Sequence, residues 1–297
     1  MKNSGVLIFI TALVFITGSC NSKSPQFVAA APSGGETMWI AANGLRLKTK
    51  IYESSQLSDH PVLVLVLHGD LLAPGAPPTY HYAFARRAAE QMDDVVAAAL
   101  LRPGYADDDG DRSEGKQGMR TGDNYTPEVV DAVAVEVREL QTKFHPAATV
   151  LAGHSGGAAI TGNLLGRHPS EVDAALLVSC PCDLSVWRNH MMKYYFPKVG
   201  PFSLLFLAPV KSLSPVDLAA GVPPSTRVRM VVGSQDPVAP PNLTREYAEA
   251  LRKRGVDVAV TIAPGLEHDI LLEPVVSEQL KRLVEAVEKD AAPRSVR

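Results

Sequence analysis

One segment points to the architecture of the whole chain: Thr149-Val150-Leu151-Ala152-Gly153-His154-Ser155-Gly156-Gly157-Ala158-Ala159. An apolar, β-branched run enters Gly-x-Ser-x-Gly, and small residues that pack closely follow it. The pattern predicts a strand, a sharp turn that presents Ser155, and a helix whose N-terminus points at the serine. Glycines on both sides remove side chains that would collide where strand and helix cross. Unpaired N–H groups at the helix N-terminus would stabilise an oxyanion formed there.

Strand and helix patterns alternate on both sides of this segment. Two strands joined by the hairpin signal Asn43-Gly44 are expected at Thr37–Ala42 and Leu45–Tyr52. Apolar strands are expected at Val62–Leu67, Val95–Leu101, Ala174–Ser179, Val228–Val232 and Val256–Ile262. Helical spacing is found in Tyr80–Met92, Glu128–Phe144, Asn242–Arg254 and Ile270–Glu288. This order predicts an α/β fold, a mostly parallel, doubly wound sheet of about eight strands with helices on both faces.

Composition indicates one globular domain. The chain has 297 residues, of which 46% are hydrophobic and 21% charged, and a formal net charge of −3. This near-neutral balance gives no electrostatic basis for nucleic-acid binding. The domain is expected over residues 37–292, with an aromatic-rich stretch at 183–215 forming a small cap insert. We expect it to be a monomer.

The N-terminus is typical of an export signal. Lys2 precedes the apolar run Val6–Ile16, and the small residues Thr17-Gly18-Ser19 lead to Cys20. This arrangement is similar to the lipobox of bacterial lipoproteins, in which Cys20 would be lipidated and become the new N-terminus. We expect a signal over 1–20, a tether over 21–36, and a location on the periplasmic side of an outer membrane. Ordinary secretion is the alternative. Membrane contact is expected only through the lipid.

The sequence Cys180-Pro181-Cys182 favours two partly buried thiols, because a bridge between residues i and i+2 demands unusual geometry. A redox pair remains the alternative. A metal site is poorly supported without a second pair of thiolates.

Two more strand ends carry reactive side chains, where active sites of open α/β sheets lie. Asp236 stands in Gly233-Ser234-Gln235-Asp236-Pro237-Val238, and His268 ends Gly265-Leu266-Glu267-His268. With Ser155 ahead of them, the chain resembles an α/β hydrolase from the first strand to the last helix. In that fold the serine attacks, the histidine moves the proton, and the aspartate orients the imidazole. Asp183 is a rival acid, although a helix cap suits it better.

The resemblance also implies an oxyanion hole. The backbone N–H of Gly156 would be one donor, and the N–H of Asp70 in His68-Gly69-Asp70 would be the other. Leu71 is the alternative second donor. An aspartate side chain at this place must point away or be paired. His68 is expected to be structural.

Further residues are weaker candidates. Leu71, Tyr105, in the turn Arg102-Pro103-Gly104-Tyr105, and Trp187, in the insert, are expected to contact substrate. The acidic run Asp107–Asp111 fails the EF-hand pattern and favours a solvated loop over a calcium site. No metal and no other cofactor is implied.

A serine nucleophile argues against the hydrolases of this fold that attack through a carboxylate. The first hypothesis is therefore a serine esterase that acts on small or medium acyl esters. A serine exopeptidase is the alternative, because Ser214-Pro215 and Tyr247–Ile262 look similar to prolyl-oligopeptidase-type domains. A catalytically silent envelope-binding protein is the hypothesis from another class. Reaction with a fluorophosphonate would separate an enzyme from a binding protein.

Overall fold

The computed structural model describes residues 34–70 and 78–291. The expected signal, most of the tether, Cys20 and Leu71 lie outside these residues. None of the helices in the described part of the chain combines the length and apolarity that crossing a membrane requires.

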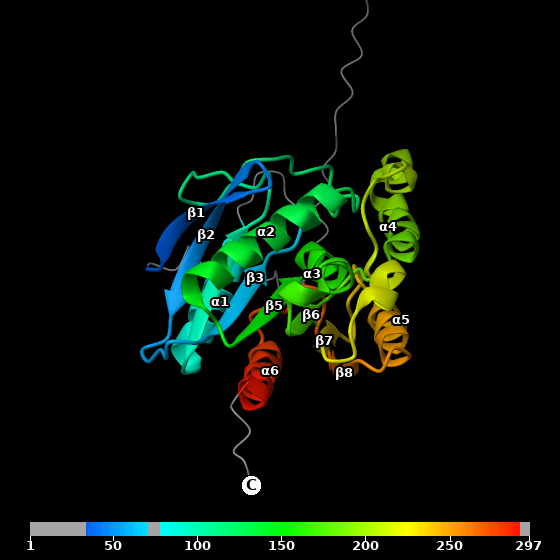
Figure 1. The fold of residues 1–297 in the computed structure, drawn as a ribbon. Coiled ribbons are helices and arrows are strands. Elements are labelled where there is room, and N and C mark those ends of the chain that lie inside the picture. Colours follow the sequence, from blue (N-terminus) through cyan, green and yellow to red (C-terminus); the bar gives the residue numbers. More distant parts are fainter. Residues whose placement is uncertain (1–33, 71–77, 292–297) are drawn as a thin grey trace, which may run out of the picture.

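Eight strands form one sheet in the order β1-β2-β4-β3-β5-β6-β7-β8 (Figure 1). Their bounds are Glu36–Ala42 (β1), Leu45–Glu53 (β2), Val62–Leu67 (β3), Val95–Leu101 (β4), Ala148–His154 (β5), Ala174–Val178 (β6), Arg227–Gly233 (β7) and Asp257–Ala263 (β8). The strands from β4 to β8 in this order run parallel, whereas β1 and β2 pair antiparallel at one edge. The predicted α/β architecture is confirmed.

Local sequence explains the strands. Every residue of β3, β4, β5 and β6 is buried, as expected for apolar strands covered on both faces. The hairpin between β1 and β2 turns through Asn43 and Gly44, whose φ angles are 51° and 81°. Two positive φ angles are what a tight two-residue hairpin requires, and asparagine and glycine adopt them at low cost.

Helices cover both faces of the sheet (Figure 1). Helices α1 (Tyr80–Gln91) and α6 (Pro274–Ala291) pack on one face, and α2 (Pro127–Phe144), α3 (Gly156–Arg167) and α5 (Pro241–Arg252) pack on the other. The expected start of the last helix at Ile270 is wrong. Ile270 and Leu271 are buried in the preceding turn, and the helix begins at Pro274, whose ring suits a first helical position.

The insert forms a cap at the edge of the molecule, beyond α3 (Figure 1). It consists of α4 (Leu184–Val199) followed by a 3-10 helix, η2 (Gly200–Leu207). Two short 3-10 helices, η1 (Pro169–Glu171) and η3 (Pro215–Gly221), lie before β6 and before β7.

Cys180 and Cys182 form a disulfide just after β6, so the expectation of two free thiols is wrong. The cysteines are separated in sequence by Pro181 alone, and their Cα atoms lie 5.1 Å apart. That separation lies within the usual range for disulfides. Both cysteines are buried.

The acidic loop is exposed at Asp108, Asp109 and Gly110, as its sequence favours, but its carboxylates also bind a buried lysine. Lys48, from β2, places its Nζ 2.7 Å from Asp107, 3.0 Å from Asp109 and 2.6 Å from Asp111. The lysine is 1% exposed. Its ammonium therefore occupies the position between the carboxylates and joins the loop to the sheet. Spacing along the loop could not reveal a partner that lies about sixty residues earlier in the chain.

Candidate active site

Ser155 stands in a strained turn between β5 and α3. Its φ is 52° and its ψ −120°, outside the helical and strand regions. A Cβ at Gly153 would lie 2.5 Å from the Gly157 carbonyl oxygen, and one at Gly157 would lie 2.4 Å from the Leu67 carbonyl oxygen. Both glycines are thus required by close backbone approach, which holds the serine at the tip of its strand.

The structure brings Ser155, His268 and Asp236 together. The Ser155 hydroxyl lies 2.9 Å from His268 Nε2, and His268 Nδ1 lies 2.9 Å from Asp236 Oδ2. The aspartate follows β7 and the histidine follows β8, so three parallel strands deliver these groups to one edge. Asp236 Oδ1 also accepts hydrogen bonds from the backbone N–H groups of Val238 and Ala239, at 2.9 and 2.8 Å.

Asp236 and His268 each stabilise the charged form of the other. Burial lowers the pKa of His268, but the neighbouring Asp236 carboxylate outweighs it, so the pKa of the imidazole is raised. Burial raises the pKa of Asp236, but His268 and the two N–H donors outweigh it, so the pKa of the carboxyl is lowered. Asp236 is therefore ionised at neutral pH, and an ionised carboxylate at Nδ1 leaves Nε2 free to accept the serine proton.

His68 and Asp183 each hold local backbone structure through hydrogen bonds. His68 is fully buried; its Nδ1 donates to the Gly69 carbonyl at 2.8 Å, and its Nε2 accepts from the Arg102 N–H at 3.0 Å. Asp183 caps α4 by accepting from the Val186 N–H at 2.9 Å. The histidine partner is thus Asp236 and not Asp183.

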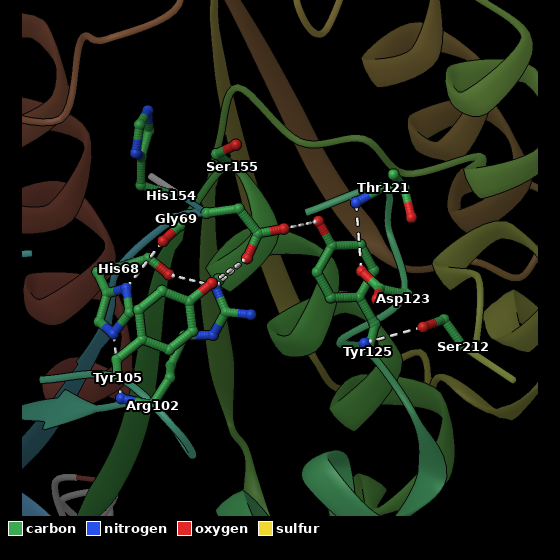
Figure 2. Close-up of polar contacts among 12 residues, drawn as sticks. His68, Gly69, Arg102, Tyr105, Thr121, Asp123, Tyr125, His154, Ser155 and Ser212 are labelled. Atoms are coloured by element: carbon green, nitrogen blue, oxygen red, sulfur yellow. Dashed lines mark hydrogen bonds and ion pairs between the residues drawn. The ribbon is translucent and has the colours of Figure 1, made fainter. Parts of the chain in front are cut away.

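A polar cluster of Arg102, Tyr105 and Tyr125, which Figure 2 labels, surrounds the Asp70 carboxylate. Arg102 Nη1 lies 3.0 Å from Asp70 Oδ1. Tyr105 and Tyr125 donate their hydroxyls to the two carboxylate oxygens, both at 2.7 Å. Arg102 is fully buried, and burial raises the pKa of each tyrosine, which keeps both as donors. The expectation that Asp70 must be paired is met by three donors.

This cluster occupies the space next to Gly156. A Cβ at Gly156 would lie 2.9 Å from the Asp70 carboxyl carbon, 2.9 Å from the Tyr125 hydroxyl and 3.0 Å from Arg102 Nη1. Only glycine fits directly after the serine, because the polar cluster fills the space that a side chain at this position would need. Since Gly156 begins α3, the cluster lies where the expected oxyanion hole would form.

A second network of hydrogen bonds, separate from the polar cluster around Asp70, joins the Gly69 turn to the His268 loop. It was not predicted from the sequence. The Gly69 N–H donates to the Tyr80 hydroxyl at 2.6 Å, and that hydroxyl lies 3.0 Å from His154 Nδ1. His154 Nε2 lies 3.1 Å from the His268 carbonyl, which Ser179 Oγ also contacts at 2.8 Å. One chain of hydrogen bonds thus runs from the turn before Asp70 to the histidine loop. Tyr80 carried no signal beyond its place on a helix.

Of the residues expected to contact substrate, Tyr105 and Trp187 are both buried, and Leu71 lies outside the described residues. Tyr105 is 1% exposed and binds Asp70, as described above. Trp187 is 5% exposed, and its Nε1 donates to the Val238 carbonyl at 2.9 Å, which attaches the cap to the Asp236 loop. In the structure, Tyr105 therefore holds the Asp70 carboxylate, and Trp187 holds the loop that carries Asp236.

Comparisons with known proteins agree on the architecture. No family model matches the chain, and no curated protein matches it. Among solved structures, Est1E from Butyrivibrio proteoclasticus, with ferulic acid bound, matches with a TM-score of 0.64 and 15% identity over 85% of this chain and 99% of its own. The proline iminopeptidase of Mycobacterium smegmatis matches with a TM-score of 0.65 and 15% identity, covering 86% of this chain and 100% of its own.

The Pyrococcus furiosus esterase Pf2001 matches with a TM-score of 0.60 and 18% identity, covering 88% of this chain and 91% of its own. Likeness at this identity shows the fold, which is the α/β-hydrolase fold. What the chain does must be argued from its own site.

Proposed function

We propose that the protein is a serine hydrolase that cleaves carboxylic esters through an acyl-enzyme intermediate. The observation that carries the proposal is the unbroken contact from Asp236 through His268 to Ser155, at 2.9 Å in each step. A serine hydroxyl is a weak nucleophile until an oriented base accepts its proton, and this arrangement supplies both base and orientation. The strained turn supports the proposal because it presents the hydroxyl at the strand end.

The reaction takes two steps. In the first, Ser155 Oγ attacks the ester carbonyl carbon while its proton passes to His268 Nε2, and the carbonyl oxygen becomes an oxyanion. Collapse breaks the carbon–oxygen bond of the ester, and His268 returns the proton to the leaving alcohol. In the second, water attacks the acyl-enzyme, again giving its proton to His268, and the acid is released with Ser155 restored.

The oxyanion would be stabilised by the backbone N–H of Gly156 and that of Asp70. The helix α3 begins at Gly156, so its N-terminal dipole favours negative charge at this point. An unpaired carboxylate on Asp70 would oppose that charge. Arg102 neutralises the carboxylate, and the hydroxyls of Tyr105 and Tyr125 fix it, which supports the assignment of the Asp70 main chain as donor.

We also propose that the protein works in the cell envelope after export, with Cys20 lipidated. This rests on the sequence pattern of residues 1–20. Mass measurement of the mature N-terminus tests it: a diacylglyceryl-modified Cys20 supports lipidation, and an unmodified mature chain supports secretion.

A substrate panel tests the proposed chemistry. Aryl esters of increasing acyl length and aminoacyl-anilides are offered to the wild type and to the Ser155→Ala variant. Ester turnover that disappears in the variant is the expected result. Faster turnover of the anilides would instead support the serine exopeptidase, and no turnover of either class would support a binding protein.

A further inference from the structure

The cap carries the densest group of exposed apolar side chains in the described part of the chain. Phe202 is 78% exposed. Of the ten exposed large hydrophobic residues within 34–70 and 78–291, seven lie in the cap: Val186, Phe196, Val199, Phe202, Leu204, Leu205 and Leu207. Soluble monomers rarely leave such a group together in water without a partner.

The geometry of η2 explains why these side chains face outward. A 3-10 helix has three residues per turn, so residues i and i+3 lie on the same side. One side, Ser203 and Phe206, faces α4: Ser203 is buried, and the Phe206 ring stacks on Tyr195 at 5.8 Å. The second side carries Phe202 and Leu205, and the third side carries Leu204 and Leu207. All four side chains are exposed.

The cap is fixed in this orientation. Arg188 of α4 is buried, and its guanidinium donates to the backbone carbonyls of Phe206, at 2.7 Å, and Ala208. Because charge-assisted hydrogen bonds are among the strong ones, the backbone of η2 stays on α4 with its apolar sides outward.

Within the segment 184–216 the charged side chains are all basic, and Asp183 and Asp217 lie just outside it. Residues 184–216 contain no aspartate or glutamate. They contain three exposed lysines, Lys193, Lys198 and Lys211. A shallow groove of about 400 Å³ is lined by Pro201, Phe202, Leu204, Leu205 and Ala208. Exposed apolar side chains on a segment whose own charges are all basic are complementary to an anionic lipid surface, which offers acyl chains next to phosphates.

We propose that this surface, the cap face, docks on a lipid surface that carries anionic headgroups. The cap face comprises Phe196, Val199, Phe202, Leu204, Leu205 and Leu207 with the three lysines. Its apolar side chains enter the headgroup region and its lysines contact lipid phosphates. This contact is separate from the lipid expected on Cys20, and it does not depend on the proposed hydrolase activity.

The cap that would dock is connected to the Asp236 loop through α4. Trp187 Nε1 donates to the Val238 carbonyl at 2.9 Å, and His190 Nε2 lies 2.7 Å from the Pro237 carbonyl. These contacts join α4 directly to the turn that carries the aspartate.

Co-sedimentation with vesicles tests the proposal. The chain starting at Ser24 is used, because it keeps every helix and strand that the structure describes and lacks Cys20. Vesicles contain phosphatidylcholine with phosphatidylglycerol in equal parts, or phosphatidylcholine alone. Binding is expected to be stronger to the mixed vesicles and to weaken as salt is added.

Two triple variants separate the apolar and charged contributions. Phe202→Ser/Leu204→Ser/Leu207→Ser is expected to weaken the partition coefficient at least about tenfold. Lys193→Gln/Lys198→Gln/Lys211→Gln is expected to lose about fivefold per lysine on the mixed vesicles. The matched control is Met119→Ser/Lys281→Gln, which removes an exposed apolar side chain and a lysine outside the cap and should bind as the parent does. Thermal unfolding checks that each variant is folded.

Three results would overturn the proposal. The first is equal vesicle binding by the parent and both folded triple variants, and the second is no binding by the parent. The third is a stable dimer in light scattering that the apolar variant converts to a monomer, because a second copy would then cover the cap face.

Discussion

Arg102 Nη1 lies 3.0 Å from Asp70 Oδ1, and the same nitrogen donates to the His68 carbonyl at 3.0 Å. One buried guanidinium therefore fixes both the backbone and the carboxylate of the turn that faces Ser155. The arginine neutralises a charge that would otherwise oppose the oxyanion, which makes it a positioning residue in the account given above.

Removing the guanidinium should lower kcat more than it changes KM. Arg102→Met leaves Asp70 with an uncompensated charge beside Gly156, and a fall in kcat of about 10- to 100-fold is expected. Tyr125→Phe, which keeps the ring in place, should lose about tenfold. In Arg102→Met/Asp70→Asn the uncompensated charge is gone, so part of the rate should return. A double variant no faster than Arg102→Met would mean that the charge is irrelevant.

The second network predicts a role for a buried tyrosine. Tyr80→Phe breaks the link between the Gly69 N–H and His154, so kcat should fall about tenfold with KM little changed. The matched control is Tyr82→Phe on the same helix. The Tyr82 hydroxyl donates to Asp107 Oδ2 over 2.9 Å and takes no part in the network of Tyr80 and His154. Steady-state kinetics on an ester substrate compare kcat and KM of the two variants. Equal losses in the two variants would assign both effects to general destabilisation.

The pH profile should report His268. The base must be neutral to accept the serine proton, so kcat/KM should fall as the pH drops through the raised pKa of His268, above its ordinary value of 6.5. Asp269 is exposed and its charge contributes to that rise. Asp269→Asn should therefore move the acid limb to lower pH while keeping most of the plateau rate. An acid limb that stays in place or moves upward would contradict this electrostatic assignment.

Glu136 should make stability depend on pH. It is fully buried, one oxygen accepts from the Thr49 hydroxyl, and Oε2 has no hydrogen-bond partner among the described residues. Burial raises the pKa of its carboxyl to about 8 from 4.5. The folded state holds this proton where the unfolded state has lost it, so stability should fall as the pH rises from about 4.5 to about 8.

Glu136→Gln removes that dependence and should stabilise the protein at pH 8, by an amount on the order of a few kcal/mol. Urea unfolding at pH 5 and pH 8 measures the difference. If the variant and the wild type lose stability equally between these two values, another group is responsible.

Local patterns were enough to predict the sheet and the reactive groups. Gly-x-Ser-x-Gly has few compatible backbone conformations, and the strands before Asp236 and His268 are apolar runs whose ends are visible in the sequence. Parallel strands bring their carboxyl ends to one edge, so the order of the three residues implied their meeting.

The support of the site depends on contacts between distant residues and was not predictable in this way. Asp70, Arg102 and Tyr125 lie on three separate segments, and no periodicity connects them. Lys48 likewise meets its carboxylates only when β2 lies beside the loop after β4. The Cys180–Cys182 disulfide depends on the backbone conformation of the Cys-Pro-Cys turn, which residue spacing does not reveal.

The central claim is that Ser155 is the nucleophile activated by His268. The most direct test is labelling with a fluorophosphonate followed by peptide mass spectrometry. One adduct per chain on Ser155 is the predicted result, absent in Ser155→Ala and slowed by about 10³-fold or more in His268→Ala. A wild type that stays unlabelled beside a reactive control hydrolase, or an adduct on another residue, would contradict the account.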